Sequence, residues 1–263
     1  MRGVDFTFEP RLDPRHAHLI WDVFFAERNR GLDLRLHFPW LGRTEGALYA
    51  GLRDGGHWLA GLCVRPLSTS VANAAAVGLV CVRAELRSQG LGRQLLDASL
   101  AALDDRRVDA LTLWTGKPEV YRSHGFETDD ASLLIHVDGV EPVARAPFEE
   151  TSWPASTDTR GLPPFALGAR CLRRGHANAI VLRDPFGDAV AEWQGPDDAV
   201  SELLAAAMPR QWRLHATNDD SLPAALRERG ARLRSEPSRL QMWRWRAGQQ
   251  RRAMPTLRLL DRI

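Results

Sequence analysis

Hydrophobic residues either alternate with polar ones or recur every three to four positions along most of this chain. Alternation is typical of half-buried strands, and the longer recurrence is typical of amphipathic helices. In the first half, the pattern predicts strands at residues 4–12, 47–53, 57–66, 77–83, 110–115 and 132–137. It predicts helices at residues 14–28, 90–103 and 118–123, and a short helix within 29–45 that is broken at Pro39.

A proline-rich segment, residues 141–165, interrupts these patterns and is typical of a linker. Beyond it, the pattern predicts strands at residues 179–183, 189–193 and 212–216, and one or two strands within 233–246. It predicts helices at residues 196–208 and 222–229. We therefore expect a first domain at residues 1–145, a linker at 146–165 and a smaller second domain at 166–263.

Composition narrows the class of protein. The 263 residues are 44% hydrophobic and 26% charged, which is ordinary for a globular chain. The net charge of +2 gives no electrostatic footprint for nucleic acid. The longest apolar run, residues 74–82, is far shorter than the roughly 20 residues of a membrane-spanning helix. The first residues lack the apolar core of a secretory signal. We expect no nucleic-acid partner, no membrane partner and a cytoplasmic location.

Cysteine and histidine spacing argues against two further classes of site. Cys63, Cys81 and Cys171 are odd in number and form no C-x-x-C motif, which disfavours a disulfide framework. The eight histidines are scattered and form no H-x-x-x-H motif. We therefore expect no metal site.

The most informative segment joins the strand at 77–83 to the helix at 90–103. Its turn reads Arg87-Ser-Gln-Gly-Leu-Gly92 and is followed by Arg93. Glycines let the backbone approach a ligand closely, and a helix N-terminus offers free N–H groups and a positive dipole end. A pyrophosphate suits such a turn, and the two arginines can add charge-assisted hydrogen bonds. The turn matches neither G-x-x-x-x-G-K-[ST] nor G-x-G-x-x-G, so it is neither a nucleotide-hydrolysing P-loop nor a dinucleotide motif.

Together with a second motif, this turn resembles the GNAT acetyltransferases. R-x-x-G-x-G at 87–92 is similar to the acetyl-coenzyme A signature of that family. Downstream, Gly116-Lys-Pro-Glu-Val-Tyr121-Arg-Ser-His-Gly125-Phe126 ends in the Y-x-x-x-G-F that follows the fifth strand of many members. The resemblance covers residues 4–140 and implies an α/β (α+β) fold, with a mixed, mostly antiparallel sheet and helices on both faces. The chain departs from the family at 116–118, where many members have an asparagine.

The resemblance also implies roles for particular residues. The pyrophosphate of acetyl-CoA would lie on the backbone of the 87–92 turn. The pantetheine arm would lie beside the strand at 80–82, whose amides would polarise the thioester carbonyl. Tyr121 would be the general acid that returns a proton to the leaving thiolate. The implied coenzyme-binding residues are Val80, Cys81, Val82, Arg87, Ser88, Gln89, Gly90, Leu91, Gly92 and Arg93.

An attacking amine must lose a proton, so a base or a water chain ending on one is needed. Glu45 and His57, near the second and third predicted strands, are candidates. Asp54 suits a hairpin turn, and Glu85 suits a solvated turn. Cys81 lies inside an apolar strand, which is typical of a structural cysteine, so we expect direct transfer without a covalent intermediate.

The second half of the chain echoes the first in its order of predicted elements. Leu226-Arg-Glu-Arg-Gly230 repeats the spacing of Tyr121 to Gly125 with a leucine at the tyrosine position. No R-x-x-G-x-G precedes the helix at 196–208. We hypothesise a degenerate, non-catalytic GNAT-like repeat that completes the acceptor pocket or forms a homodimer. The alternative is an unrelated α/β accessory domain.

These observations predict an N-acetyltransferase that moves an acetyl group from acetyl-CoA, without a metal, to a primary amine of a small molecule or peptide in a ternary complex. One alternative is a non-catalytic CoA-binding sensor or interaction protein. Another is an acyltransferase with a different acyl-CoA or a hydroxyl acceptor. The acceptor and the acyl-chain length stay open, because they depend on residues 29–45 and on the second domain.

Overall fold

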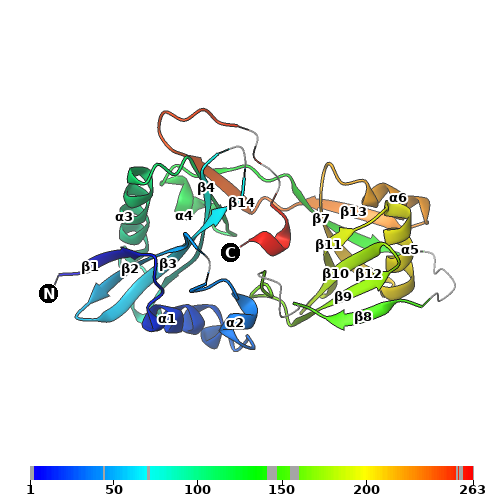
Figure 1. Cartoon of the computed structure of the whole chain (residues 1–263), viewed down its shortest axis with the longest axis horizontal. Helices are drawn as coiled ribbons and strands as arrows, with labels where there is room; N and C mark the ends of the chain where they lie inside the picture. The colour runs from blue at the N-terminus through cyan, green and yellow to red at the C-terminus, as the bar shows by residue number, and fades with distance from the viewer. Residues whose placement is uncertain are drawn as a thin grey trace. The chain divides into compact units, whose positions relative to one another are not determined.

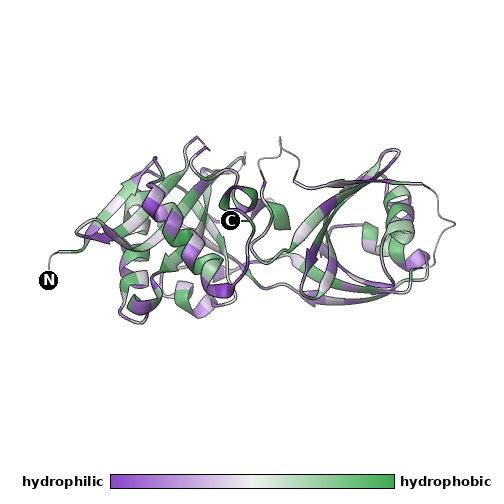
Figure 2. Ribbon diagram, turned by 90° about the horizontal axis from the view of Figure 1, so that it is seen from below, coloured by the Kyte–Doolittle hydropathy of each residue, from purple (hydrophilic) through white to green (hydrophobic). Residues whose placement is uncertain are grey.

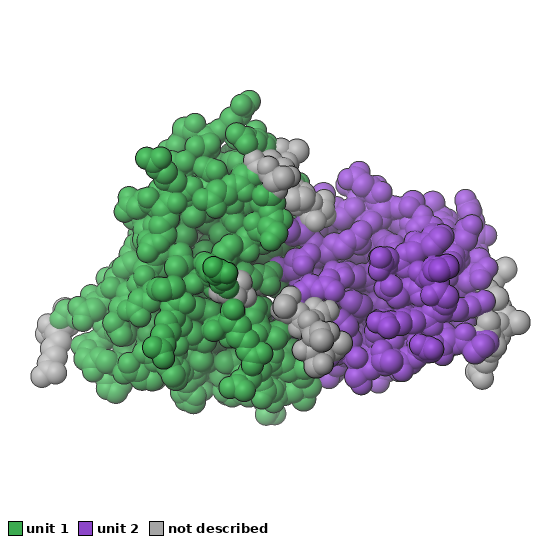
Figure 3. Space-filling model, viewed as in Figure 1, with its two compact units in different colours: residues 1–129, 240–255, 262–263 green, residues 130–239, 256–261 purple. Residues whose placement is uncertain are grey.

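The computed structural model describes residues 3–43, 45–69, 72–140, 147–154, 160–252, 254 and 257–262. The chain forms two compact units (Figure 3). Each of them contains one seven-stranded sheet. Unit 1 comprises residues 1–129, 240–255 and 262–263, and unit 2 comprises residues 130–239 and 256–261.

In unit 1, helices cover both faces of a mostly antiparallel sheet (Figure 1). In spatial order its strands are β1 (Asp5–Glu9), β2 (Leu48–Asp54), β3 (His57–Leu67), β4 (Ala74–Val82), β5 (Ala110–Trp114), β14 (Gln241–Trp245) and β6 (Glu127–Thr128). One face carries α1 (Pro14–Phe24), the 3₁₀ turn η1 (Ala26–Arg28) and α2 (Leu34–His37). The other carries α3 (Leu91–Asp105) and α4 (Pro118–Arg122), with the 3₁₀ turn η2 (Ala84–Leu86) between β4 and α3.

The alternation of side chains along β3 separates two hydrophobic cores in unit 1. Leu62 and Val64 are buried in the core beneath α3, and Cys63 is buried in the core beneath α1. Successive strand residues point to opposite faces, so a sheet with helices on both sides needs hydrophobic residues on both. Figure 2 shows hydrophobic and hydrophilic residues alternating along several strands, where only one face is buried.

In unit 2, both helices pack over one core (Figure 1). In spatial order its strands are β13 (Arg232–Pro237), β7 (Ser132–Asp138), β12 (Gln211–Thr217), β11 (Gly187–Gln194), β10 (Ala177–Asp184), β9 (Gly168–Arg174) and β8 (Glu149–Ser152). The helices are α5 (Asp197–Ala207) and α6 (Leu222–Glu228), and the 3₁₀ turn η3 (Leu259–Asp261) follows near the C-terminus.

The two sheets have the same topology. Each has three antiparallel pairings, then one parallel pairing, then two antiparallel pairings. A helix joins the parallel pair in each: α3 between β4 and β5, and α5 between β11 and β12. The second unit therefore repeats the topology of the first, as the echo in the sequence predicts.

Each sheet receives its sixth strand from the other half of the sequence. β14, from the end of the second half, pairs with β5 in unit 1. β7, which follows β6 in the first half, pairs with β12 in unit 2. The expected division into 1–145, 146–165 and 166–263 does not coincide with these units, because pairing between strands distant in sequence leaves no mark in local hydrophobic patterns.

Three short or polar strands also differ from the expectation. β8 lies within the expected linker, and its residues are exposed. β9 includes three arginines in its seven residues, which masks its alternation. β6 is only two residues long. The major helices and the central strands agree with their predicted positions to within a few residues, since their periodic apolar residues form the cores.

Candidate functional site

β4 and β5 diverge in the middle of the unit 1 sheet. Their parallel ladder joins Ala74–Ala76 to Ala110–Thr112 and goes no further, although β4 continues to Val82. The divergence follows a β-bulge: β4 has one residue more than β3 between Gly78 and Cys81, and Leu79 adopts a φ of 54°. A bulge bends its strand and ends regular pairing. The edge of β4 that faces β5 is thereby free to receive an extended ligand.

The bulge also sorts the predicted residues of β4 onto two faces. Val80 and Val82 pack toward the core beneath α3. Cys81 is 2% exposed and lies in the opposite core, beneath α1. Its thiol donates a hydrogen bond to the Gly61 carbonyl, with sulfur and oxygen 3.4 Å apart. Burial raises the pKa of Cys81 to about 12, so the thiol is protonated at neutral pH and unsuited to act as a nucleophile.

The turn before α3 leaves the helix N-terminus uncapped. Ser88 and Gly90 have φ values of 64° and 81°, and Gly90 is the N-cap, so no side chain bonds the first helical N–H groups. In contrast, Asp13 caps α1 and Asp33 caps α2. A Cβ added at Gly90 would meet no atom within 4 Å. The first N–H groups of α3 therefore have no side-chain cap, and the space beside Gly90 is open, which suits the binding of an anion.

The two arginines of the turn have different surroundings. Arg87 forms an ion pair with Glu27, with Nη2 and Oε2 2.6 Å apart, and its Nε donates to the Val82 carbonyl at 3.3 Å. This contact joins the turn to η1 and occupies part of the guanidinium. Arg93 is exposed on the first turn of α3 and lines a pocket beside it. Of the two, Arg93 is the better placed to meet a ligand in that pocket.

A pocket of about 320 Å³, which we name the β4–α4 pocket, lies between β4, α3, α4 and the end of β5. It brings together five of the residues predicted from the sequence: Val80, Val82, Gly92, Arg93 and Tyr121. Cys81, Arg87, Ser88, Gln89, Gly90 and Leu91 are not part of its lining. The pocket thus combines the N-terminal turn of α3, one face of the diverging β4 and the only tyrosine of the second motif.

Tyr121 is half-buried and packs edge-to-face against Phe126, with ring centroids 6.1 Å apart. Burial raises the pKa of Tyr121, because removal from water disfavours the phenolate. The hydroxyl therefore holds its proton at neutral pH and is able to donate it to a group that becomes basic in the pocket.

Six further residues line the pocket and were not singled out from the sequence: Leu96, Thr115, Lys117, Val120, Ser123 and His124. The side chain of His124 is 4% exposed, and its Nδ1 lies 3.0 Å from a carboxylate oxygen of Asp97 on α3. This contact joins the turn that follows α4 to α3. The available signal was the position of His124 and Lys117 inside the tyrosine motif itself.

The expected bases do not lie in this pocket. Glu45 and His57 are both exposed, and neither is part of the lining. Asp54 faces His57 across the β2–β3 hairpin, as a turn residue would. Glu85 is exposed, and its carboxylate lies 3.6 Å from the Arg83 guanidinium. None of the four residues considered from the sequence as proton acceptors is therefore part of the pocket lining.

A larger hollow, of about 770 Å³, lies on β7, β12 and β13 of unit 2. Its exposed arginines already have acidic partners: Arg232 pairs with Asp138 at 2.9 Å, and Arg234 pairs with Glu236 at 2.9 Å. Volume alone therefore does not make this hollow the better candidate. We favour the β4–α4 pocket because its lining includes Arg93 and Tyr121.

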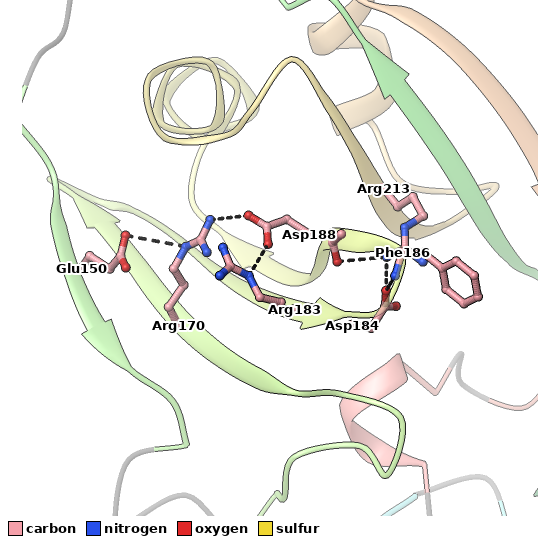
Figure 4. A network of polar contacts seen from close by, with 8 residues as sticks. Glu150, Arg170, Arg183, Asp184, Phe186, Asp188 and Arg213 are labelled. Atoms are coloured by element: carbon pink, nitrogen blue, oxygen red, sulfur yellow. Dashed lines mark hydrogen bonds and ion pairs between the residues drawn. The ribbon is translucent and has the colours of Figure 1, made fainter. Parts of the chain in front are cut away.

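The buried carboxylates of unit 2 are paired in the same way (Figure 4). Asp188 accepts from Arg170 at 2.7 Å and from Arg183 at 3.3 Å. Asp184 accepts from Arg213 at 2.6 Å and from the backbone N–H of Phe186 at 2.7 Å. A buried charge is stable only with such partners. The pairing therefore accounts for these carboxylates as structural residues, without a role in binding a ligand.

Within the described residues, no group of three or more histidine, cysteine or acidic side chains is arranged to hold a metal ion. None of the helices described is both long and apolar enough to span a bilayer.

Comparison with known proteins finds one matching family model and several solved structures of similar fold. The model of the acetyltransferase (GNAT) family matches residues 14–126. A GCN5-related N-acetyltransferase from Anabaena variabilis ATCC 29413 is 13% identical, with a TM-score of 0.64 over 92% of this chain and 73% of that one. Eis1 from Mycobacterium abscessus is 15% identical, with a TM-score of 0.58 over 92% and 73%.

A GCN5-related N-acetyltransferase from Kribbella flavida is 14% identical, with a TM-score of 0.57 over 92% of this chain and 72% of that one. No curated protein matches the sequence. At these identities the solved structures show a shared fold, and the coverage shows that the likeness includes both units.

Proposed function

We propose that this chain, whose residues 14–126 match the model of the GNAT acetyltransferase family, transfers an acetyl group from acetyl-CoA to a primary amine in a ternary complex. One observation carries the proposal. The start of α3, the diverging edge of β4 and Tyr121 converge on the same small pocket. These are an anion site, a strand partner and a proton donor, the three features that a thioester of a pyrophosphate-containing coenzyme requires.

This geometry supports a mode of binding for acetyl-CoA. The pyrophosphate lies at the uncapped N-terminus of α3, where free N–H groups and the helix dipole attract negative charge. Arg93 adds a cation beside it. The pantetheine arm carries amides, and it lies along β4 beyond Ala76, where the ladder to β5 has ended. Val80 and Val82 supply the apolar wall.

Transfer then proceeds by direct attack. The amine nitrogen attacks the thioester carbonyl carbon, and backbone amides of β4 near Val80 and Val82 stabilise the negative charge on the oxygen. The carbon–sulfur bond breaks, and Tyr121 donates its proton to the leaving thiolate. The attacking nitrogen gives its proton to water, because neither Glu45 nor His57 lies in the pocket. Tyr121 regains a proton from solvent.

The two tyrosines of the chain provide a matched test. Tyr121→Phe removes the hydroxyl of a residue that lines the pocket. Tyr49→Phe removes a hydroxyl buried in the core beneath α1, where it accepts a hydrogen bond from the Gly42 N–H at 2.7 Å. Both variants are assayed for product with acetyl-CoA and a panel of amines: a peptide N-terminus, a lysine peptide, an aminoglycoside, a polyamine and an amino sugar.

We expect Tyr121→Phe to lower kcat by about 10²- to 10⁴-fold, the usual contribution of a general acid, with little change in acetyl-CoA affinity. We expect Tyr49→Phe to retain kcat and to lose only stability. Equal turnover by Tyr121→Phe and the native protein would remove Tyr121 from the acid role. Tight binding of acetyl-CoA with no product from any acceptor would instead favour a CoA-binding sensor.

A further inference from the structure

Lys117 is the only lysine in the chain, and it lines the β4–α4 pocket. We propose that Lys117 is itself an acetyl acceptor, so that the protein acetylates its own Nζ when acetyl-CoA is bound and no other amine occupies the pocket. This inference rests on the proposed function, because it uses the same donor and the same general acid.

Lys117 and the proposed acid line the same pocket. Lys117 is the N-cap residue just before α4, with a φ of −128° and a ψ of 64°, and Tyr121 lies within α4. Both residues contribute to the pocket wall. The Lys117 N–H donates to the Thr115 hydroxyl at 2.9 Å, which fixes the turn from which the side chain extends.

The side chain is also free to react. Within the part of the chain that the structure describes, no carboxylate forms an ion pair with Lys117. Arginines of the same unit are held by acids, as Arg244 is by Asp104 at 2.7 Å and Arg246 is by Asp109 at 3.0 Å. A guanidinium keeps its proton and is not acylated, whereas the amine of lysine becomes a nucleophile once it is deprotonated. The other cation of the lining, Arg93, is therefore no alternative acceptor.

The reaction is the proposed transfer with an internal acceptor. The Lys117 ammonium gives one proton to water, and Nζ attacks the carbonyl carbon of acetyl-CoA to form a carbon–nitrogen bond. As the second N–H proton leaves to solvent, the carbon–sulfur bond breaks and the thiolate takes the proton of Tyr121, which is replaced from solvent. The products are an uncharged acetyl-lysine and free coenzyme A, so the pocket loses one cation.

The test uses the full chain, acetyl-CoA and no added amine. Intact mass is followed with time, and peptide mapping separates Lys117 from the N-terminal amine, the other primary amine of the chain. Acetyl-CoA binding is measured by calorimetry on the same preparation. Lys117→Arg is the matched variant, since it keeps the charge and removes the acylatable amine. Two controls show whether labelling depends on the pocket. Excess coenzyme A competes with acetyl-CoA for it, and a heat-unfolded sample has no pocket.

We expect one acetyl group on Lys117, none on Lys117→Arg at that position, and suppression by coenzyme A. We expect the labelling rate to fall by about 10²- to 10⁴-fold in Tyr121→Phe. Binding without acetylation of Lys117, or equal labelling of the folded, unfolded and Tyr121→Phe chains, would overturn this inference and leave the proposed function standing. A folded protein that binds no acetyl-CoA would overturn both.

Discussion

The two units place a strand, a turn and a helix at the same position in the same topology, but the turns differ. In unit 1, β4 reaches α3 through residues 83–90, and the glycine N-cap leaves the first N–H groups free. In unit 2, β11 reaches α5 through Gly195 and Pro196 alone, and α5 begins with Asp197 and Asp198. Two carboxylates in the first turn satisfy the helix dipole themselves and repel a phosphate.

The two units also differ at the position of the proposed general acid. Tyr121 on α4 is half-buried and lines a pocket. Leu226, which has the equivalent spacing on α6, is fully buried in the core of unit 2. The repeated fold therefore does not by itself determine the chemistry of a unit. In our proposal, the chemistry depends on a few residues of the turn before α3 and of α4. Unit 2 has the same topology as unit 1 but lacks the features that we propose bind and protonate the coenzyme in unit 1.

The largest expected effect comes from separating the two halves of the sequence. A fragment of residues 1–145 lacks β14, whose Met242 is fully buried in the unit 1 core. It also loses the hydrogen bond that the Thr112 hydroxyl donates to the Met242 carbonyl (3.0 Å) and the one that this hydroxyl accepts from the Gln241 side-chain amide (3.2 Å). We expect the fragment alone to lack a cooperative thermal transition, as judged by circular dichroism.

Co-expression of residues 146–263 is the control for that fragment, because it restores β14, and we expect the two pieces to be purified together. A fragment of residues 1–145 that melts cooperatively at the temperature of the full chain would show that the exchanged strand is dispensable.

A smaller effect is expected on the stability of unit 1 when the pH is lowered. His16 of unit 1 is fully buried, stacks on Trp58 with centroids 4.5 Å apart, and burial lowers its pKa from 6.5 to about 4. The unfolded chain therefore binds this proton between pH 6.5 and 4 while the folded chain does not. Stability falls as the pH decreases through that window, by about 3 kcal/mol in total at 1.36 kcal/mol per pKa unit.

His16→Phe keeps an aromatic ring against Trp58 and removes the titration. We measure the free energy of unfolding of this variant in urea at several pH values. We expect it to lack the decrease between pH 6.5 and 4 that His16 causes in the native protein, whatever its value at pH 7. An unchanged slope between pH 6.5 and 4 in His16→Phe would show that other groups account for the acid sensitivity. Within the described residues of unit 2, no histidine is buried to this degree, so we expect acid to loosen unit 1 first in hydrogen exchange.

The smallest effect is expected at the unit 2 helix that resembles α3. Asp197→Asn combined with Asp198→Asn removes the two charges that stabilise the N-terminus of α5. We expect a loss of about 0.3–1 kcal/mol for each charge and no change in acetyl-CoA affinity. A marked gain or loss of acetyl-CoA binding would place a coenzyme site in unit 2 and end the distinction between the units.

The sequence predicted what local periodicity and glycine encode. The strand ending at Val82, the helix from Leu91 and the turn between them follow from apolar spacing and from Gly90 and Gly92. The bulge at Leu79 was not predictable, because leucine gives no local signal for a positive φ. The contact of His124 with Asp97 depends on the packing of α4 against α3, and the strand exchange depends on long-range pairing.

Calorimetric titration with acetyl-CoA tests the central claim most directly, that the turn before α3 holds the coenzyme. Gly90→Glu places a carboxylate at the helix N-terminus and strains a φ of 81°. Gly248→Glu is the matched control, because Gly248 also has a φ of 81° and open space around it, but is not part of the turn before α3. We predict micromolar binding by the native protein and by Gly248→Glu, and none by Gly90→Glu. Equal binding by all three, or none by the folded native protein, would contradict the account.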